Sequence, residues 1–238
     1  MSDAALSSLQ LQTVLSRKME IIADNIANIS TPGFKAEMMA VIPEGDGTAP
    51  KDELMAVPLG LVRDIRAGDF NHTGNSLDLA IKGDGYFVVQ TPQGERYTRN
   101  GRFQLDGDGQ IVNSSGYPVL GDGGGAITVP AGSGAISISR DGTISTKDGN
   151  IGTIGVVSFA NQRTLQRADG GLFIANDPPV PAEKAEVIQG SIENSNVKAV
   201  IQITEMIQVT RSYQQAQRIV DSENERVTRA IRSLTQVS

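Results

Sequence analysis

The chain has 238 residues, of which 39% are hydrophobic, and its 27 acidic and 21 basic side chains give it a formal net charge of -6. This length and hydrophobic content can support one or two compact domains, while the acidic balance argues against a general nucleic-acid binder, which needs a basic face to neutralise phosphates. The absence of cysteine excludes disulfides, thiol catalysis and Cys-ligated zinc, and it leaves the compartment open.

Glycine and proline divide the chain into three parts. All 26 glycines and all 10 prolines lie between residues 32 and 190. Gly destabilises a helix interior by about 1 kcal/mol and Pro by about 3 kcal/mol, so the two ends favour helix and the middle favours strands and turns. We therefore predict an α+β fold. Long N- and C-terminal α-helices form a coiled-coil-like pair of arms, and an extended connector joins them to a central, mostly antiparallel β domain.

The first predicted element is a helical arm over residues 1–35, which ends where Pro32 and Gly33 prevent the helix from continuing. Asn25 and Asn28 flank its apolar stripe. A buried Asn can set the register of a coiled coil, but near a helix end Asn is more often a cap or solvated, and both alternatives stay open. The stripe recurs every three or four residues, at Leu11, Leu15, Met19, Ile22, Ile26 and Ile29.

The start of the chain does not resemble a cleavable secretory signal. Residues 1–18 hold an early acid and place Arg17 and Lys18 late, whereas a signal peptide begins with basic residues and continues in an unbroken apolar run. No stretch of the sequence approaches the roughly 18 apolar residues of a membrane-spanning helix. We therefore expect export without a cleaved signal, if the chain is exported, and no membrane insertion.

An extended connector is predicted over residues 36–79, where prolines and acids interrupt short apolar runs. The central β domain follows over 80–186, and a return connector over 187–195. Strand-like segments around tight turns predict three hairpins, at 86–90 with 96–98, at 102–105 with 110–113, and at 136–139 with 143–146. Asn-Gly and Asp-Gly pairs supply positive φ angles and predict further reversals at Asn100-Gly101, Asp148-Gly149 and Asp169-Gly170.

The last predicted element is a helical arm over residues 196–238. Its apolar positions alternate in steps of three and four with Glu223 as the polar interruption, which is typical of a helix that packs lengthwise against other helices. Acidic residues dilute the arginines of this arm, which favours a solvated face over a nucleic-acid site. The stripe consists of Met206, Val209, Tyr213, Ala216, Val220, Val227, Ala230 and Leu234.

The two stripes are the predicted contacts between subunits. Two long helices gain too little from their own apolar side chains to offset the entropy of ordering them. We therefore expect both arms to fray in the isolated monomer and to become rigid when neighbouring subunits cover the stripes.

The sequence offers few groups for catalysis or metal binding. His72 is the single histidine, which excludes multi-His metal sites, and it lies in a polar segment typical of an exposed loop. The Asp-Gly repeat at 106–109 lacks the third early acid and the distal Glu of a calcium loop. The glycines at 121–125 are not followed by the Lys-Ser/Thr of a phosphate-binding loop. We expect no catalytic residue, no cofactor and no metal, and we predict that the chain is not an enzyme.

Three blocks of sequence resemble the flagellar basal-body rod and hook family. They are DNIANISTPGFK at 24–35, SLDLAIKGDGYF at 76–87 with YTRNG at 97–101, and GSIENSNV at 190–197 with Met206, Ile207 and 211–213. They lie near the start, the middle and the end, so the resemblance covers the whole architecture. Within the family the chain is most similar to proximal rod subunits. Asp24, where the family usually has Asn, and Arg211 to Gln214 depart from the distal rod shaft pattern.

The resemblance implies packing and geometric roles for the residues of these blocks. One group is the end of the first arm and its turn into the connector, namely Asn25, Asn28, Thr31, Gly33 and Phe34. A second group is the first strand of the β domain, namely Leu77, Asp78, Leu79, Gly83, Gly85 and Phe87. A third is the return into the second arm, namely Glu193, Ser195, Asn196 and Val197.

The resemblance also implies a structural subunit of the flagellar rod, in the periplasm. Its implied partners are copies of itself, other proximal and distal rod subunits, and the flagellar type III export apparatus during assembly. The terminal helices would stack and transmit torque from motor to hook. Three alternatives remain: a distal rod or hook-type subunit, a secreted carbohydrate-active β protein with convergent carboxylates, and a coiled-coil adaptor that forms a small defined oligomer.

Overall fold

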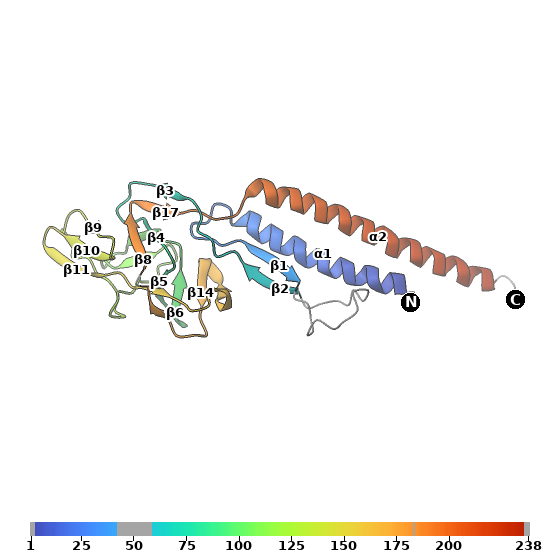
Figure 1. Ribbon diagram of the computed structural model, residues 1–238, viewed down its shortest axis with the longest axis horizontal. Helices are drawn as coiled ribbons and strands as arrows, with labels where there is room; N and C mark the ends of the chain where they lie inside the picture. The colour runs from blue at the N-terminus through green and yellow to red at the C-terminus, as the bar shows by residue number, and fades with distance from the viewer. Residues whose placement is uncertain (1–2, 42–58, 183, 236–238) are drawn as a thin grey trace. The chain divides into compact units, whose positions relative to one another are not determined.

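The computed structural model describes residues 3–41, 59–182 and 184–235. Along the described chain, helix α1 (Asp3–Ala27) precedes all the strands and helix α2 (Ala199–Thr235) follows them (Figure 1). The chain forms two compact units. Of the described residues, the first contains 3–27, 37–41, 59–63 and 198–235, and the second contains 28–36, 64–182 and 184–197. The α+β class predicted from the distribution of glycine and proline is confirmed.

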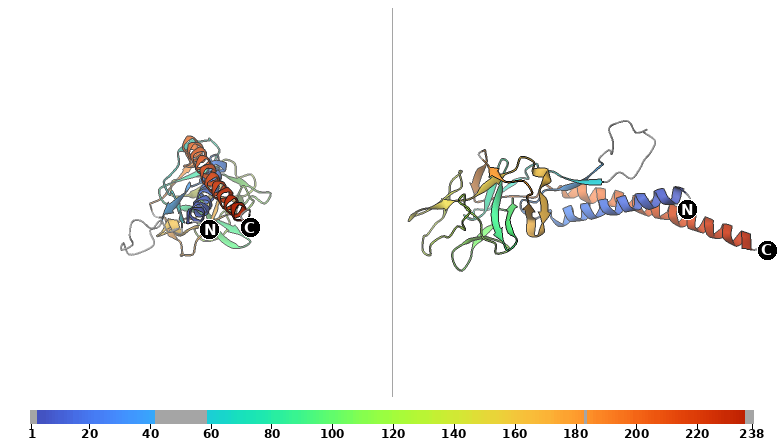
Figure 2. Two further views of the ribbon diagram at one scale, coloured as in Figure 1. Left: turned by 90° about the vertical axis from the view of Figure 1, so that its right-hand side faces the viewer. Right: turned by 90° about the horizontal axis from the view of Figure 1, so that it is seen from below.

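In the first unit, α1 and α2 lie side by side and run antiparallel (Figure 2). The Gln12 side-chain amide donates to Oε1 of Gln217 over 2.8 Å, and the hydroxyl of Thr210 donates to the sulfur of Met19 over 3.8 Å. In both pairs the residue numbers add to 229, so each residue further along α1 faces a residue one position earlier in α2. This antiparallel register determines which positions of the two helices face each other.

The first unit also contains a β-hairpin ladder made from the predicted connector. Strand β1 (Glu37–Val41) pairs antiparallel with β2 (Leu59–Arg63), with Glu37 opposite Arg63. Their side chains form an ion pair at 3.2 Å, and the guanidinium is buried. The segment predicted to be an extended connector therefore begins with a paired strand, and the part of that prediction over residues 42–58 lies outside the described residues.

The second unit is built around a six-stranded antiparallel sheet of order β13-β14-β6-β5-β12-β15. Its strands are β5 (Tyr86–Thr91), β6 (Gly94–Thr98), β12 (Val156–Ser158), β13 (Gln166–Ala168), β14 (Leu172–Ile174) and β15 (Val180–Pro181). Two short 3-10 helices, η1 and η2, lie at Gln162–Thr164 and Asp169–Gly171. The strands of this sheet range in sequence from Tyr86 to Pro181, so the sheet joins segments nearly 100 residues apart along the chain.

Smaller ladders complete the second unit. Strand β3 (Phe70–His72) pairs with β17 (Ser191–Glu193), β4 (Leu79–Lys82) with β16 (Glu186–Gln189), and β7 (Phe103–Leu105) with β8 (Ile111–Asn113). Strands β9 (Ser137–Ile138), β10 (Thr143–Thr146) and β11 (Gly149–Thr153) form a three-stranded sheet. Most of the predicted return connector lies on β16 and β17, which pair with the strands β4 and β3 that precede the main sheet in the sequence.

Strand β5 separates two hydrophobic clusters because successive side chains of a strand point to opposite faces. Phe87 and Val89 belong to the larger cluster, while Tyr86 and Val88 belong to the smaller one. All four side chains are buried. A strand covered on both faces reads as a continuous apolar run, which is the sequence Tyr-Phe-Val-Val at this position.

The three predicted hairpins are confirmed as the pairs β5 with β6, β7 with β8, and β9 with β10. Of the predicted reversals, Gly149 and Gly170 adopt positive φ angles of 128° and 71°. Gly101 is required for a different reason from the one predicted. A Cβ added there would lie 1.8 Å from the carbonyl oxygen of Leu79, so close backbone approach demands glycine at this position.

The predicted segment boundaries differ from those of the helices. The first arm was placed at residues 1–35, whereas α1 ends at Ala27. The chain turns immediately afterwards, because the amide of Thr31 donates to the carbonyl of Asn28 over 3.2 Å and Pro32 follows. The second arm was placed from residue 196, and α2 begins at Ala199.

We predict that Gly101→Ala severely destabilises the second unit. The new methyl group would overlap the Leu79 carbonyl, which belongs to rigid backbone, so we expect a loss of about 3 kcal/mol or more in the free energy of unfolding. Urea denaturation followed by the near-ultraviolet circular dichroism of the buried tyrosines measures this loss. Gly107→Ala is the matched control, because a Cβ there meets nothing within 4 Å and should leave the midpoint almost unchanged.

Candidate functional site: a buried ion cluster and the apolar faces of the helices

Three charged side chains meet inside the second unit. The ammonium of Lys35 lies 2.5 Å from Oε1 of Glu193, and the guanidinium of Arg99 lies 3.3 Å from Oε2 of the same carboxylate. The side chains of Lys35, Arg99 and Glu193 are 1%, 3% and 0% exposed. A buried carboxylate is thus held between two buried cations, and we call these three residues the ion cluster.

Backbone groups satisfy most of the remaining hydrogen-bonding capacity of the ion cluster. Lys35 Nζ donates to the carbonyl of Arg66 over 2.9 Å, and the amide of Gly68 donates to Glu193 Oε1 over 3.0 Å. The Arg99 guanidinium donates to the carbonyls of Ile81 at 3.0 Å and Gly83 at 2.6 Å. Such bonds offset the desolvation of buried charges, without which the cluster would be strongly unfavourable.

The ion cluster carries one more positive than negative charge. Burial lowers the pKa of Lys35 below its ordinary value of 10.5, while the neighbouring carboxylate of Glu193 opposes that effect. The Arg99 guanidinium lies 5.4 Å from the centre of the Tyr86 ring, whose face attracts a cation. Nε of Arg99 has no hydrogen-bond partner among the described residues. The surplus charge is therefore balanced in part by carbonyl dipoles and an aromatic face.

Each member of the ion cluster comes from one of the three sequence blocks. Lys35 ends the first block, Arg99 lies in the second and Glu193 in the third. Next to them, Gly33 adopts a φ of 70° and its amide donates to the Glu193 carbonyl over 2.7 Å. A Cβ on Gly33 would lie 2.4 Å from the carbonyl carbon of Arg99. The three blocks therefore meet at one point of the fold.

Asn196 joins three chain segments beside the ion cluster. Its side-chain oxygen accepts from the amide of Ala36 at 2.7 Å, and its side-chain nitrogen donates to the carbonyls of Asp64 and Arg66, both at 2.9 Å. Its own amide donates to the carbonyl of Phe34 over 3.3 Å. The segments that lead out of α1, out of β2 and into α2 are thereby fastened to one another within the second unit.

Asn25 performs a comparable role in the first unit. Its side chain is buried, accepts from the amide of Glu37 at 2.9 Å, and donates to the Glu37 carbonyl at 2.8 Å and to Oε1 of Gln202 at 3.1 Å. The side chain therefore binds the backbone of β1 as a neighbouring strand would, and it also reaches α2. This arrangement differs from each role that the sequence left open for Asn25, namely a register residue of a coiled coil, a helix cap or a solvated side chain.

The other residues of the first block shape the turn after α1. The Thr31 hydroxyl donates to Oδ1 of Asn28 over 3.1 Å, and the Phe34 amide donates to the carbonyl of Thr31 over 3.3 Å. Phe34 is buried, and the guanidinium of Arg167 lies 4.7 Å from its ring centre. These contacts agree with the packing and turn-forming roles that the resemblance implied.

The second and third blocks supply core and backbone geometry. Leu77, Leu79 and Phe87 are members of the larger hydrophobic cluster. The carbonyl of Asp78 accepts from the amides of Gly190 and Ser191, which joins the two blocks directly. Gly83 adopts a φ of 97°, and a Cβ on Gly85 would lie 2.8 Å from a methyl of Val156. The hydroxyl of Ser195 accepts from the amide of Val197, and Val197 is buried.

The predicted stripe residues of the helices differ in exposure. Ile22, Val209 and Ala216 are buried within the single chain. Leu15, Met19, Ile26, Met206, Tyr213 and Val220 are half-buried, and Leu11 and Val227 are exposed. Ile29 lies in the turn after α1, and the side chains of Ala230 and Leu234 lie outside the described residues. The buried positions are covered inside one molecule, so only the exposed and half-buried ones can offer area to a neighbour.

A second apolar face of α2 was missed by sequence reasoning. Val200, Ile203 and Ile207 are 78%, 50% and 49% exposed and recur in steps of three and four. Val200 and Ile203 precede the start of the predicted stripe at Met206 and Ile207 follows it, and the same spacing rule would have found them had it been applied from residue 200. Lys35 and Arg99 were also missed as a pair, because no spacing in the sequence brings them together.

The described residues contain no group of three or more His, Cys, Asp or Glu side chains that could hold a metal ion. His72 is on β3 rather than in a loop, it is exposed, and its Nδ1 lies 3.4 Å from the hydroxyl of Ser191. Among the helices that the structure describes, none is long and apolar enough to cross a membrane.

Comparison with known proteins agrees with this arrangement. Three family models match, described as "Flagella basal body rod protein" over residues 5–35, "Flagellar hook protein FlgE/F/G D1 domain" over 80–146, and "Flagellar basal body rod FlgEFG protein C-terminal" over 188–233. The flagellar basal-body rod protein FlgF of Caulobacter vibrioides is 36% identical over the full length of both chains. The chain belongs to the flagellar basal-body rod protein family.

Other relatives refine the position of the chain within the rod family. FlgF of Salmonella typhimurium is 35% identical over 88% of this chain and 89% of its own, and the rod protein FlgG of Bacillus subtilis is 34% identical over 87% and 90%. The chain is FlgF-like, as the sequence blocks indicated. The rod family consists of structural proteins and not of enzymes, which agrees with the prediction from the sequence.

We predict that Glu193→Gln destabilises the second unit by about 3–5 kcal/mol, because it leaves two buried cations without their carboxylate. Urea denaturation measures the change. Glu95→Gln is the matched control, since Glu95 is exposed on β6 and its replacement should fall within about 0.5 kcal/mol of the parent. Equal midpoints for the parent and Glu193→Gln would show that the ion cluster does not stabilise the fold.

The lowered pKa of Lys35 predicts a pH dependence with a definite sign. In the window between the pKa of the folded chain and the ordinary value of 10.5, the unfolded chain binds this proton more tightly, so stability rises with pH. Below the folded pKa the contribution is constant and least favourable. The free energy of unfolding of the parent, minus that of Lys35→Met, should therefore increase on approaching pH 10.5. A difference that stays flat or decreases would contradict this assignment.

Proposed function

We propose that the chain is a proximal rod subunit that assembles through α1 and α2 with copies of itself and with other rod subunits, and that this assembly transmits torque from motor to hook. The observation that carries the proposal is the apolar area left open on the paired helices, at Leu9, Leu11, Ile207 and Val227 among others. Exposed apolar faces of this kind are covered in stable assemblies. Long helices that cover one another lengthwise resist bending and slip.

The antiparallel packing of α1 and α2 supports a coiled-coil-like arm. Buried Ile22 lies close to the level of buried Val209, because opposed residues have numbers that add to about 229. Each helix therefore has one face covered by the other and further apolar positions that are open. In this proposal a pair of helices, not a single helix, is the unit that stacks against neighbours, and the pairing reduces the entropy lost on assembly.

The ion cluster and Asn196 support the proposed transmission of torque. Within the second unit, the segment that follows α1 is bound to the segment that precedes α2 by the Gly33 amide on the Glu193 carbonyl and by the Asn196 amide on the Phe34 carbonyl. Charged and backbone hydrogen bonds in a buried position yield little under load. A force delivered through either helix is thus received at one fixed point of the β fold.

Assembly in the periplasm after export through the flagellar type III apparatus, without cleavage, is part of the proposal. The relatives named as basal-body rod proteins support a place in the basal body. Identification of the N-terminal residue of the chain recovered from purified basal bodies tests this part.

A place in the distal rod is the second candidate, because a relative named FlgG is 34% identical over most of the chain. The greater coverage by FlgF of Caulobacter vibrioides favours the proximal place. A density map of the assembled rod, in which this chain is located by its side chains, distinguishes the two positions.

We predict that Val220→Asp abolishes swimming when it replaces the parent chain in cells. Val220 is half-buried on the α2 stripe, opposite Leu9 in the antiparallel register, and a charge there opposes close helix packing. Motility in soft agar and the yield of rods from purified basal bodies measure the effect. Gln215→Asp is the control, since Gln215 is exposed on the same helix and should leave motility unchanged. Normal rods in the Val220→Asp strain would show that rod assembly does not depend on the packing of these helices.

A further inference from the structure

Strand β3 is exposed on both of its faces. Its three residues, Phe70, Asn71 and His72, are all exposed, and so is every residue from 69 to 76. Successive side chains of a strand point to opposite faces, so neither face of β3 is covered by another described part of the second unit. Figure 1 shows β3 at the margin of that unit, with β17 along its inner side. The strand is therefore held mainly by its ladder with β17.

The outer edge of β3 has unpaired backbone groups. His72 lies opposite Ser191, and Phe70 lies opposite Glu193. The amide of Ser191 donates to the carbonyl of Asp78 over 3.2 Å, and the carbonyl of Glu193 accepts from the turn after α1, so both turn away from β3. Opposed residues of an antiparallel pair either bond to each other or both turn their groups outward, so Phe70 and His72 turn theirs to the outer edge. No described residue binds these amides and carbonyls.

The open edge of β3 is complementary to itself. When two copies of β3 lie antiparallel around a two-fold axis at Asn71, Phe70 of each copy stands opposite His72 of the other. Each of these pairs exchanges two hydrogen bonds, which satisfies every open amide and carbonyl of both edges. The same register places the rings of Phe70 and His72 next to each other on one face, and cross-strand aromatic pairs stabilise antiparallel sheets.

The charges of the exposed segment do not oppose this pairing. Asp69 is the only Asp, Glu, Lys or Arg among residues 69–76, and the segment contains no proline. Proteins usually block an exposed sheet edge with charges or with proline. In the two-fold register Asp69 stands opposite Thr73 of the other copy, whose hydroxyl can donate to a carboxylate. The edge therefore presents hydrogen-bonding groups without the features that would keep a second strand away.

We propose that the free subunit forms a two-fold dimer in which β3 of one copy pairs antiparallel with β3 of the other, in the strand order β17-β3-β3-β17. This surface is separate from the helices, and the proposal does not depend on the proposed function. An interface that uses the same patch on both copies closes on itself, so it produces a dimer and not a stack. The dimer covers an edge that would otherwise be a template for aggregation.

The dimer should be weak and transient. A stable interface uses about 20–30 residues a side, whereas the exposed segment at 69–76 is much shorter. We expect a dissociation constant on the order of 100 μM, which is typical of weak contacts. Two parallel copies in the same register would place amide against amide, so the parallel arrangement does not form these bonds.

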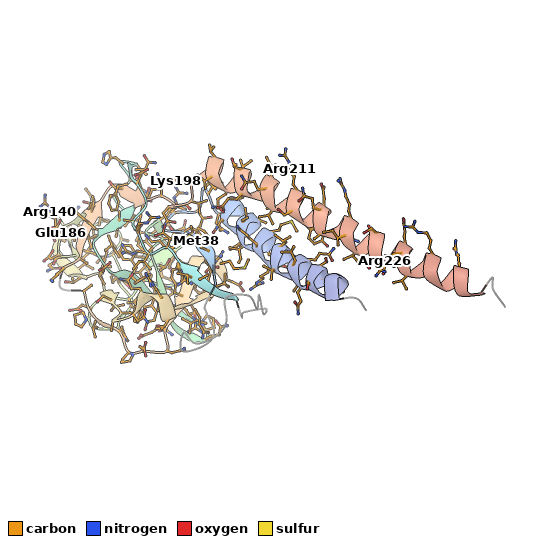
Figure 3. The ribbon with its side chains drawn as sticks, turned by 45° about the vertical axis from the view of Figure 1, so that its right-hand side comes forward. Met38, Arg140, Glu186, Lys198, Arg211 and Arg226 are labelled. Atoms are coloured by element: carbon orange, nitrogen blue, oxygen red, sulfur yellow. The ribbon has the colours of Figure 1, made fainter. Side chains whose placement is uncertain are left out.

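The chain lacks cysteine, so a single substitution tests the contact in the full-length protein. In the proposed register Asn71 faces its own copy as a non-hydrogen-bonded pair, with Cα atoms about 4.5 Å apart, a separation that a disulfide spans. We expect the Asn71→Cys chain to form a disulfide-linked dimer under mild oxidation at least about tenfold faster than the Arg140→Cys chain, because paired thiols react as if within one molecule. Arg140 is exposed at another margin of the second unit (Figure 3), so the Arg140→Cys chain measures random collision.

Replacement of His72 tests the backbone bonds themselves. In the Asn71→Cys chain we expect His72→Pro to slow crosslinking about tenfold or more, because it removes the outward amide from both edges and leaves the ladder with β17 its own bonds. His72→Thr keeps the amide and a strand-forming side chain, and we expect it to slow crosslinking by at most about fivefold. Urea denaturation of each variant, followed by the near-ultraviolet circular dichroism of the buried tyrosines, shows that the second unit is folded.

The helices are excluded as the source of the crosslink by a third variant. Val220 belongs to α2 in the first unit, so Val220→Asp should leave the crosslinking rate of the Asn71→Cys chain unchanged. A rate that falls with Val220→Asp would assign the contact to the helices and overturn the proposal.

The remaining outcomes also decide the matter. Fast crosslinking of the Asn71→Cys chain that falls with His72→Pro and persists with His72→Thr supports the proposal. Equal rates for the Asn71→Cys and Arg140→Cys chains, a rate that His72→Pro leaves unchanged, or crosslinking of Asn71→Cys only to other proteins of a cell extract overturns it. Motility and rod yield test the rod function separately, so loss of this dimer would leave that function intact.

Discussion

Glu193 is buried between Lys35 and Arg99, and the rest of the second unit depends on this carboxylate being satisfied from several directions at once. A buried charge is tolerated only where opposite charges and hydrogen bonds replace water. The carboxylate itself is on β17, and those groups come from the turn after α1, from the chain after β2 and from the residue that follows β6. The electrostatic requirement thus fixes the relative positions of four distant chain segments within the second unit.

The arrangement gives a physical reason for the short sequence blocks of the rod family in this chain. A residue of a periodic apolar stripe can be replaced by another apolar residue of similar size with little loss of stability. Gly33 tolerates no side chain against the Arg99 backbone, and the ion cluster tolerates no change of charge sign at any of its three members. Chemistry of this kind requires particular residues at particular positions.

Periodicity was sufficient to predict the helices and the tight hairpins. Val209 and Ala216 are buried as the α2 stripe requires, and the hairpin at Tyr86 to Thr98 forms as its turn residues indicate. Local patterns do not report contacts between distant segments, so the pairing of β16 with β4 and the ion cluster could not be derived from them. Gly101 illustrates the limit, because the sequence showed that glycine belongs there but not that the Leu79 carbonyl excludes every larger residue.

The antiparallel course of α1 and α2 has a practical consequence for labelling. Because the beginning of α1 and the last turns of α2 lie at the same end of the first unit, a fluorescent protein or affinity peptide fused to either terminus would occupy the same pole. Gly123, Gly124 and Gly125, in the second unit, have open space around them. An epitope inserted among these three glycines would report the position of the subunit while leaving both ends of the chain unmodified.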